Sequence, residues 1–292
     1  AHEALRNRKH VYNEKPLAGT LPEGKELVKL ARAQRRLLGG APDTFLGGGL
    51  QTCRKLVDDG VIGTPIGAVA FMLCHGHESW HPNPEFYYQP GGGPLLDMGP
   101  YYLSALILLM GPIARVSGAT RISFPTRTIT SQPKAGTVIK VETPSHLVGV
   151  LEFHSGAVAT LITSFDVWAH TLPCIQVFGS DGTLQMPDPN TFGGPIRVRR
   201  PGDSDWQEMP LTHGFAENYR GLGVADLASA AMQRRPARAG AALTLHVLEV
   251  MHAILQAGAT GKYVKIKSKC DRPAPLPVGS DDTILAALQA KR

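Results

Sequence analysis

A glycine- and proline-rich segment that leads into a long apolar run constrains the fold of this chain more than any other feature. It covers residues 91–111, with the sequence GGGPLLDMGPYYLSALILLMG. Glycines permit positive φ angles and close backbone approach, and Pro94 suits the first turn of a helix. We therefore predict a buried amphipathic helix that begins at Pro94. Because Pro100 lacks an amide hydrogen, we expect a kink or a restart there.

Two polar side chains lie four residues apart in this predicted helix, so they share one face. They are Asp97 and Tyr101, a carboxylic acid and a phenol that would project together from an anchored helix. The same pattern is typical of a core helix with a capping aspartate and packing tyrosines. The segment therefore needs support from elsewhere in the chain before it indicates a function.

Composition narrows the class of protein. With 292 residues and 43% hydrophobic residues, the chain can bury a sizeable core. The net charge is +6, but the basic residues form small separated groups without a recognition motif, so we expect no nucleic-acid partner. There is no apolar run of membrane-spanning length and no apolar leader, which predicts a soluble cytoplasmic protein without a membrane partner. The four cysteines form no CxxC pair, which favours reduced thiols.

The hydrophobic pattern divides the chain into two parts. Residues 1–60 alternate weak strands with helices, at 21–36 and 50–59, as in a small α/β unit. From residue 61 onward the chain is sheet-rich, with closing helices at 215–233 and 240–256 and a short final helix at 283–290. We predict antiparallel strands at residues 68–74, 114–121, 146–153, 157–165, 174–178, 183–186 and 196–199. The predicted fold is α/β followed by α+β, with an open, mainly antiparallel sheet and helices on one face.

A tripeptide near the start and the glycine-rich segment together carry a family resemblance. Glu14-Lys15-Pro16 precedes the GGGPLLDMGPYY sequence by about eighty residues, and the chain resembles the Gfo/Idh/MocA family of NAD(P)-dependent sugar and polyol oxidoreductases. The resemblance implies a Rossmann domain and a C-terminal α+β domain whose open sheet packs subunit against subunit, as a homodimer or homotetramer. No GxGxxG motif is present. We therefore expect a truncated chain, with residues 1–60 as the remnant of the dinucleotide domain and residues 61–292 as the substrate and oligomerisation domain.

The resemblance also implies a site. It assigns catalysis to Lys15, Asp97 and Tyr101, and places Glu14, Lys15 and Pro16 beside NAD or NADP, with a cis Lys15–Pro16 bond. Because an adjacent ammonium stabilises a phenolate, Tyr101 is our candidate acid/base with Lys15 as its electrostatic partner, while Lys15 itself stays a second candidate. The predicted substrate is a sugar, polyol or related hydroxylated compound. Its contacts are expected from Lys15, Trp80, His81, Asp97 and Tyr101, with the aromatic residues 86–88 as a further wall of the pocket.

Two other functions stay open from the residues alone. If His75 and His77 lie in a strand they point to the same side, and together with Glu78 or His81 they could ligate a metal in an isomerase or hydrolase. Alternatively, the chain could be a non-catalytic oligomerisation or binding module. Chelator-sensitive activity without nicotinamide would favour the first alternative, and assembly without nicotinamide affinity would favour the second.

Overall fold

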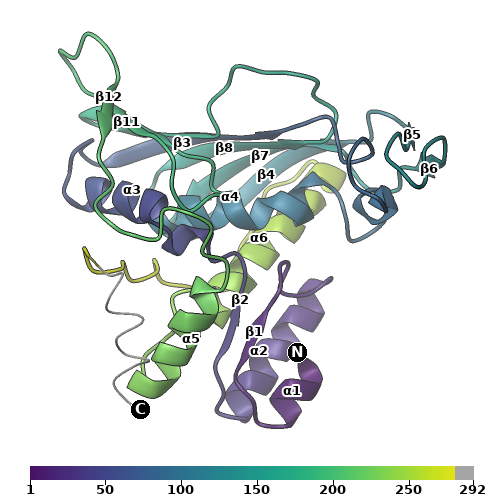
Figure 1. Cartoon of the computed structure of the whole chain (residues 1–292), viewed down its shortest axis with the longest axis horizontal. Coiled ribbons are helices and arrows are strands. Elements are labelled where there is room, and N and C mark those ends of the chain that lie inside the picture. Colours follow the sequence, from purple (N-terminus) through teal and green to yellow (C-terminus); the bar gives the residue numbers. More distant parts are fainter. Residues whose placement is uncertain (280–292) are drawn as a thin grey trace.

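The computed structural model describes residues 1–279, and a nine-stranded sheet dominates them (Figure 1). The strand order across this sheet is β12-β11-β10-β9-β3-β8-β7-β4-β13. In chain order its strands are β3 (Pro65–Leu73), β4 (Ile113–Arg121), β7 (His146–Phe153), β8 (Val158–Ser164), β9 (Ile175–Gly179), β10 (Gly182–Met186), β11 (Ile196–Arg199), β12 (Gln207–Met209) and β13 (Val264–Lys265). The sheet is open, and its helices lie on one face, as the sequence predicted.

Alternating apolar residues place the core on the helical face of this sheet. Along β7, for example, every second side chain from Leu147 to Phe153 is buried, while the intervening ones stay half-buried. The buried face of the sheet as a whole packs against the helices α3 (Gly48–Asp58), α4 (Pro94–Met110) and α6 (Ala241–Thr260). Among residues 1–279, the loop that follows β8 crosses the opposite face and no helix covers it (Figure 1), so we call it the open face.

One strand pairing differs from the prediction. All strand neighbours in the large sheet are antiparallel except β3 and β8, which run parallel from the Gly67–Val158 pair to the Leu73–Ser164 pair. After β3 the chain passes through α4 and enters the sheet again at β4, which is not next to β3. Strands β7 and β8 then fill the positions between β4 and β3, and this places β8 beside β3. The predicted mainly antiparallel sheet is thus confirmed, but the prediction of antiparallel strands is wrong at this one pair, and the sheet is mixed.

Helix α4 begins at Pro94, as predicted, and continues without interruption to Met110. The expected restart at Pro100 does not occur. Nearly every residue of α4 is buried, so packing on both sides holds the helix together despite the missing amide hydrogen. Helix α6 is long and apolar enough to cross a membrane by length and composition, but its apolar side chains are packed against β4, α2 and α4, as in a core helix.

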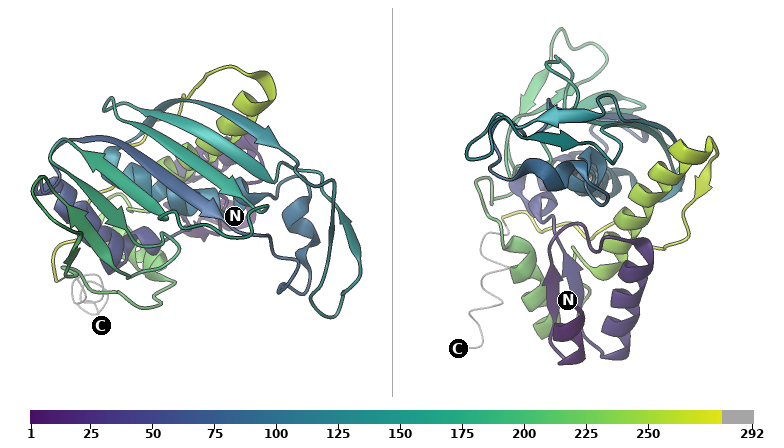
Figure 2. Two further views of the ribbon diagram at one scale, coloured as in Figure 1. Left: turned by 90° about the horizontal axis from the view of Figure 1, so that it is seen from above. Right: turned by 90° about the vertical axis from the view of Figure 1, so that its right-hand side faces the viewer.

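A smaller unit projects from the large sheet. Strands β1 (Val11–Asn13) and β2 (Leu38–Gly40) pair in parallel and lie between helices α2 (Leu21–Ala33) and α5 (Leu222–Gln233), with α1 (His2–Arg6) beside α2 (Figure 2). Thr20 and Glu23 form a capping box at the start of α2. Helix α5 packs on β1 and β2, so a segment from late in the chain completes the unit that the first residues begin. The boundary at residue 60 stays a prediction.

Short elements escaped the sequence pattern. Strands β5 (Thr126–Thr128) and β6 (Val138–Lys140) form a separate hairpin, and one-turn helices cover Thr44–Leu46 and Pro84–Tyr88. Strands β12 and β13 were also missed, because two or three residues cannot display an alternating pattern. The predicted final helix at 283–290 lies outside the described residues.

Candidate active site

Lys15 stands directly beyond the carboxyl end of β1. The Lys15–Pro16 peptide bond is cis, as the resemblance implied. Glu14 is exposed, and its carboxylate accepts a hydrogen bond from the Lys15 amide at 3.1 Å. The carboxyl end of a parallel strand pair is where open α/β sheets bind their ligands, so the position of Lys15 is that of a ligand-facing residue.

Lys15 and Asp97 meet across 82 residues of sequence. The Lys15 Nζ lies 2.5 Å from Asp97 Oδ1 and 2.7 Å from the Asp97 carbonyl oxygen. Both side chains are mostly buried, with 19% and 15% of their surfaces exposed. The first turn of α4 therefore presents a carboxylate and a carbonyl to one ammonium group. The structure thus brings together the two residues that the resemblance paired.

Tyr101 lies one helical turn after Asp97 and is almost completely buried. The Lys15 ammonium is 5.5 Å from the centroid of its ring, and the Arg220 guanidinium carbon is 5.9 Å from the same centroid. Both cations therefore lie within the distance at which a cation interacts with the face of an aromatic ring.

His77 is a site residue that the sequence analysis considered only as a metal ligand. Its Nε2 lies 3.3 Å from Asp97 Oδ2, so Asp97 is held between an ammonium and an imidazole. Burial alone would raise the pKa of Asp97, but the hydrogen bond with His77 and the Lys15 charge together hold this pKa below its ordinary value. The carboxylate is therefore ionised at neutral pH.

Arg220 was missed altogether because its place depends on a distant cap. Asp43, just beyond β2, accepts hydrogen bonds from the amides of Gly221 and Gly223 at 2.8 and 3.0 Å and so anchors the start of α5. Arg220 immediately precedes this cap, and its guanidinium also donates to Asn190 Oδ1 at 2.8 Å. No local sequence pattern could have linked residue 220 to residue 101.

Aromatic residues surround the outer side of His77. The ring centroids of Tyr87 and Trp80 lie 4.1 and 5.2 Å from that of His77, and His81 packs edge-on against both at 5.4 Å. Trp80 is largely exposed. Burial, and then the charge of Asp97, raise the pKa of Tyr87, so its hydroxyl stays protonated at neutral pH. The cluster offers apolar ring faces and hydrogen-bonding groups beside Asp97, and the substrate contacts of Trp80 and His81 stay predictions.

The histidines do not converge as the metal hypothesis requires. Strand β3 ends at Leu73, so His75 and His77 follow it rather than lie in it. The His75 ring stacks on Trp168, His77 bonds to Asp97, and the Nδ1 of His81 accepts from the Asn83 amide. Within residues 1–279 no group of three His, Cys, Asp or Glu side chains is arranged to hold a metal ion. The metal alternative therefore has no geometric support in this part of the chain.

The ion pair between Lys15 and Asp97 can be tested through the pH dependence of the free energy of unfolding. Because the folded-state pKa of Asp97 is lowered, its ionised form stabilises the fold at neutral pH, and this contribution is lost as pH falls from about 4 through the lowered value. Wild type is expected to be more stable than Asp97→Asn at pH 7, and this difference should shrink as pH is lowered toward 3. Denaturant unfolding of both proteins at each pH measures it. An equal difference at pH 7 and pH 3 would contradict the assigned pKa shift.

Comparison with known proteins agrees with this picture. Residues 50–185 match the GFO/IDH/MocA C-terminal domain. D-xylose dehydrogenase from Paenarthrobacter nicotinovorans is 24% identical over 229 residues, which cover 75% of this chain and 58% of that protein. D-glucoside 3-dehydrogenase from Escherichia coli K12 is 30% identical over 164 residues, covering 53% of this chain and 45% of that protein. The chain thus spans less than two thirds of the length of these relatives.

A solved structure supports the fold independently. An NAD binding oxidoreductase from Klebsiella pneumoniae superposes with a TM-score of 0.77 at 21% sequence identity, over 92% of this chain and 76% of that one. At this level of identity the match concerns the arrangement of the elements, which includes the mixed sheet and its helices. The chain is therefore similar to the GFO/IDH/MocA C-terminal domain over residues 50–185, and it shares the arrangement of its elements with the Klebsiella pneumoniae oxidoreductase.

Proposed function

We propose that this protein is an NAD(P)-dependent oxidoreductase that acts on a secondary hydroxyl group of a sugar, polyol or related compound. One observation carries the proposal: a mostly buried series of hydrogen-bonded polar side chains, Lys15–Asp97–His77, whose lysine lies beside Tyr101 at the carboxyl end of β1. The names of the two dehydrogenase relatives, which act on xylose and on glucosides, support the substrate class.

Oxidising a secondary alcohol requires a hydride acceptor at the carbon and a proton acceptor at the hydroxyl oxygen. A bound nicotinamide supplies the first. Of the residues in this chain, Tyr101 is our candidate for the second, and the positive charge of Lys15 stabilises the phenolate that accepts the proton. Asp97 fixes the lysine, and His77 fixes the second oxygen of Asp97. The mobile side chain of Lys15 is therefore held in one position before substrate arrives.

The residues around Lys15 fit a nicotinamide because they lie at the edge of the small sheet where its parallel strands end. Lys15 and Asp43 follow the adjacent parallel strands β1 and β2, and such an edge receives dinucleotides in doubly wound folds. We infer that residues 1–60 are the C-terminal part of a dinucleotide-binding domain, and that residues 61–292 bind substrate and form the oligomer.

The open face of the sheet supports self-association. Its side chains include several half-buried apolar residues, namely Phe71, Val148, Val150, Ile162 and Phe178. We infer that this face joins subunits in a homodimer or homotetramer. We also infer that the enzyme is cytoplasmic and that its partners, apart from its own subunits, are small molecules.

The experiment is a nicotinamide assay on the protein purified from its own source. We expect NAD⁺ or NADP⁺ to be reduced in the presence of at least one compound among D-xylose, methyl glucosides and myo-inositol, and Lys15→Met to lower that rate at least about 100-fold. Circular dichroism of the variant controls for folding. The intact mass of the native protein, compared with 31.3 kDa for this chain, tests the inference about the dinucleotide domain. Activity that is independent of nicotinamide, or unaffected by Lys15→Met, would overturn the proposal.

A further inference from the structure

A second pocket, of about 640 Å³, opens at the end of the large sheet where β3 and β8 finish. None of Lys15, Asp97 and Tyr101 lines it. Its wall includes His75, Glu78, Phe124, Arg127, Thr128 and Trp168. The volume lies within the range of pockets that hold small molecules, so the question is which chemistry its lining would recognise.

The parallel pairing of β3 and β8 creates this pocket. Their carboxyl ends are adjacent, so the loops at 74–81 and 165–174 leave the sheet side by side, and the β5–β6 hairpin packs against them. Arg127 of β5 joins the three segments: its guanidinium donates to the carbonyls of His75 and Phe165, and its Nε lies 2.9 Å from Glu78 Oε1. The pocket floor is therefore a fixed, buried polar cluster.

The charge of this floor excludes an anionic ligand. The single positive charge of Arg127 faces two carboxylates, Glu78 at 2.9 Å and Asp166 at 3.8 Å, and all three side chains are at least nine-tenths buried. The Nδ1 of His75, a residue of the pocket wall, is buried without a hydrogen-bond partner, and the Glu78 carboxylate also lines the pocket. A buried polar atom without a partner is costly, and a neutral ligand with hydroxyl groups, which both donate and accept hydrogen bonds, would satisfy it.

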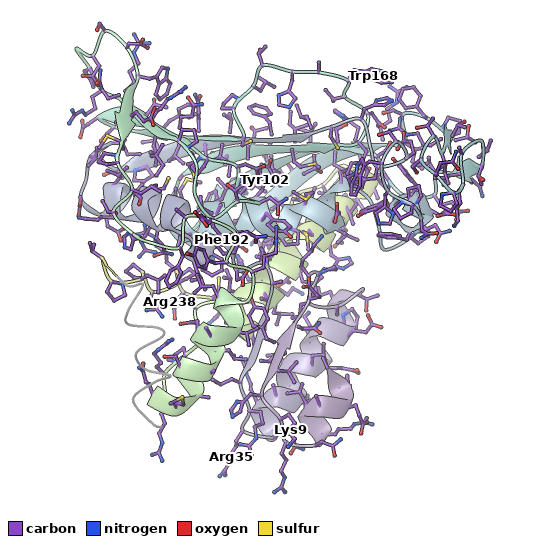
Figure 3. All side chains as sticks on the ribbon, viewed as in Figure 1. Lys9, Arg35, Tyr102, Trp168, Phe192 and Arg238 are labelled. Carbon is purple, nitrogen blue, oxygen red and sulfur yellow. The ribbon has the colours of Figure 1, made fainter. Side chains whose placement is uncertain are left out.

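The rim of the pocket is aromatic. The indole of Trp168 is 81% exposed and lies at the surface beyond the outer face of the sheet (Figure 3), with one of its faces stacked on the His75 ring at a centroid distance of 3.3 Å. Phe124, also part of the wall, is 44% exposed. Hydroxyl groups of Ser79, Thr126, Thr128 and Thr130 complete the lining. Flat apolar faces combined with hydroxyls and a carboxylate match a pyranose ring, which has an apolar face and a rim of hydroxyls.

We propose that this pocket binds a neutral saccharide unit, stacked on Trp168 and hydrogen-bonded to the Glu78–Arg127 floor. The pocket is next to the candidate active site without being part of it. His77, which bonds to Asp97, directly precedes Glu78, and the Phe165 ring packs 4.6 Å from the His77 ring while its carbonyl accepts from Arg127. The proposal rests on this pocket alone and does not require the oxidoreductase activity.

Saturation-transfer NMR titrations with methyl β-D-glucopyranoside test the proposal. We expect a binding event that persists in Lys15→Met and weakens at least tenfold in Trp168→Ala. Because Trp168 is mostly exposed, its removal should not disturb folding, and Phe124→Ala, at a second exposed position in the wall, should weaken the same event. Trp206→Ala is the matched control, since Trp206 does not line the pocket, and it should bind as wild type does.

Three results would overturn the proposal. The first is an absence of saccharide binding to the wild-type protein. The second is binding that Lys15→Met removes and Trp168→Ala leaves intact, which would place the sugar only in the candidate active site. The third is a Trp168→Ala protein that loses binding together with its subunit assembly, as measured by light scattering, which would make Trp168 an interface residue.

Cellobiose distinguishes the two sources of such a saccharide. If the pocket holds the distal ring of a longer substrate, one cellobiose binds per chain, and both Lys15→Met and Trp168→Ala weaken that event. If it holds a separate sugar, two molecules bind per chain, and Trp168→Ala removes only one of the events. Both results support a saccharide in the pocket, and they assign it to substrate recognition or to an independent ligand.

Discussion

Tyr101→Phe is expected to lower kcat for sugar oxidation by about 10²- to 10⁴-fold, the usual contribution of a positioned acid or base. The substitution removes a single oxygen from a ring whose centroid lies 5.5 Å from the Lys15 ammonium and 5.9 Å from the Arg220 guanidinium carbon. Packing of the ring is retained, so KM should change less than kcat. Steady-state kinetics of the variant and the wild type measure both constants.

Tyr102→Phe is a matched control for this experiment. Tyr102 is the next residue of α4 and is equally buried, but its hydroxyl pairs with Cys174, away from Lys15. Its kcat should stay within about threefold of wild type, because a remote buried hydroxyl contributes about 1 kcal/mol to stability and nothing to proton transfer. If Tyr101→Phe keeps full turnover while Lys15→Arg loses it, the proton is carried by Lys15 instead.

Asp226→Ala is expected to reduce the free energy of unfolding by about 3 kcal/mol, the lower end of the range for breaking a buried ion pair. Asp226 is completely buried in α5. Its carboxylate accepts from Arg235 Nη2 at 2.7 Å, from Arg238 Nη1 at 2.6 Å and from the Arg238 amide at 2.7 Å. Both guanidinium groups are partly exposed and recover some hydration, which is why the larger values of the range do not apply.

Urea denaturation measures this loss, with Asp59→Ala as the control. Asp59 pairs with Lys55 on the exposed surface of α3, and removal of such a pair changes stability by about 0.5 kcal/mol or less. A loss below about 1 kcal/mol in Asp226→Ala would mean that water replaces the carboxylate. The contacts of Asp226 with Arg235 and Arg238 also bear on the candidate site. They fix the connection from α5 to α6, and Arg220, which lies near Tyr101, directly precedes the start of α5.

Much of the fold could be predicted from the sequence because its long elements bury one face. The strands at 146–153 and 196–199 have the predicted bounds, and the helix at Pro94 begins where its proline indicated. Periodicity could not indicate the direction of β3 relative to β8, because a strand has the same alternating pattern in both kinds of sheet. Nor could it detect the three-residue strands of the β5–β6 hairpin, which nevertheless form a wall of the second pocket.

The candidate site divides in the same way. A short motif at residues 14–16 and a second motif at residues 91–102 pointed to Lys15, Asp97 and Tyr101, and the structure brings these three together. His77 was present in the sequence as a possible ligand, but its hydrogen bond to Asp97 depends on the path of the loop after β3. Arg220 depends on the Asp43 cap, and the Trp168 pocket depends on two loops whose stacked residues, His75 and Trp168, are 93 residues apart in sequence.

The sequence by itself determined which segments form helices and strands, which of their faces are buried, and which residues form the two motifs of the candidate site, since each of these depends on residues near one another in the chain. Only the tertiary structure decided that β3 and β8 run parallel, that His77 and Arg220 join the site, and that a second pocket forms behind it. These features arise from contacts between residues far apart in sequence. Their geometry is set by the packing of the whole sheet against its helices, which no local pattern encodes.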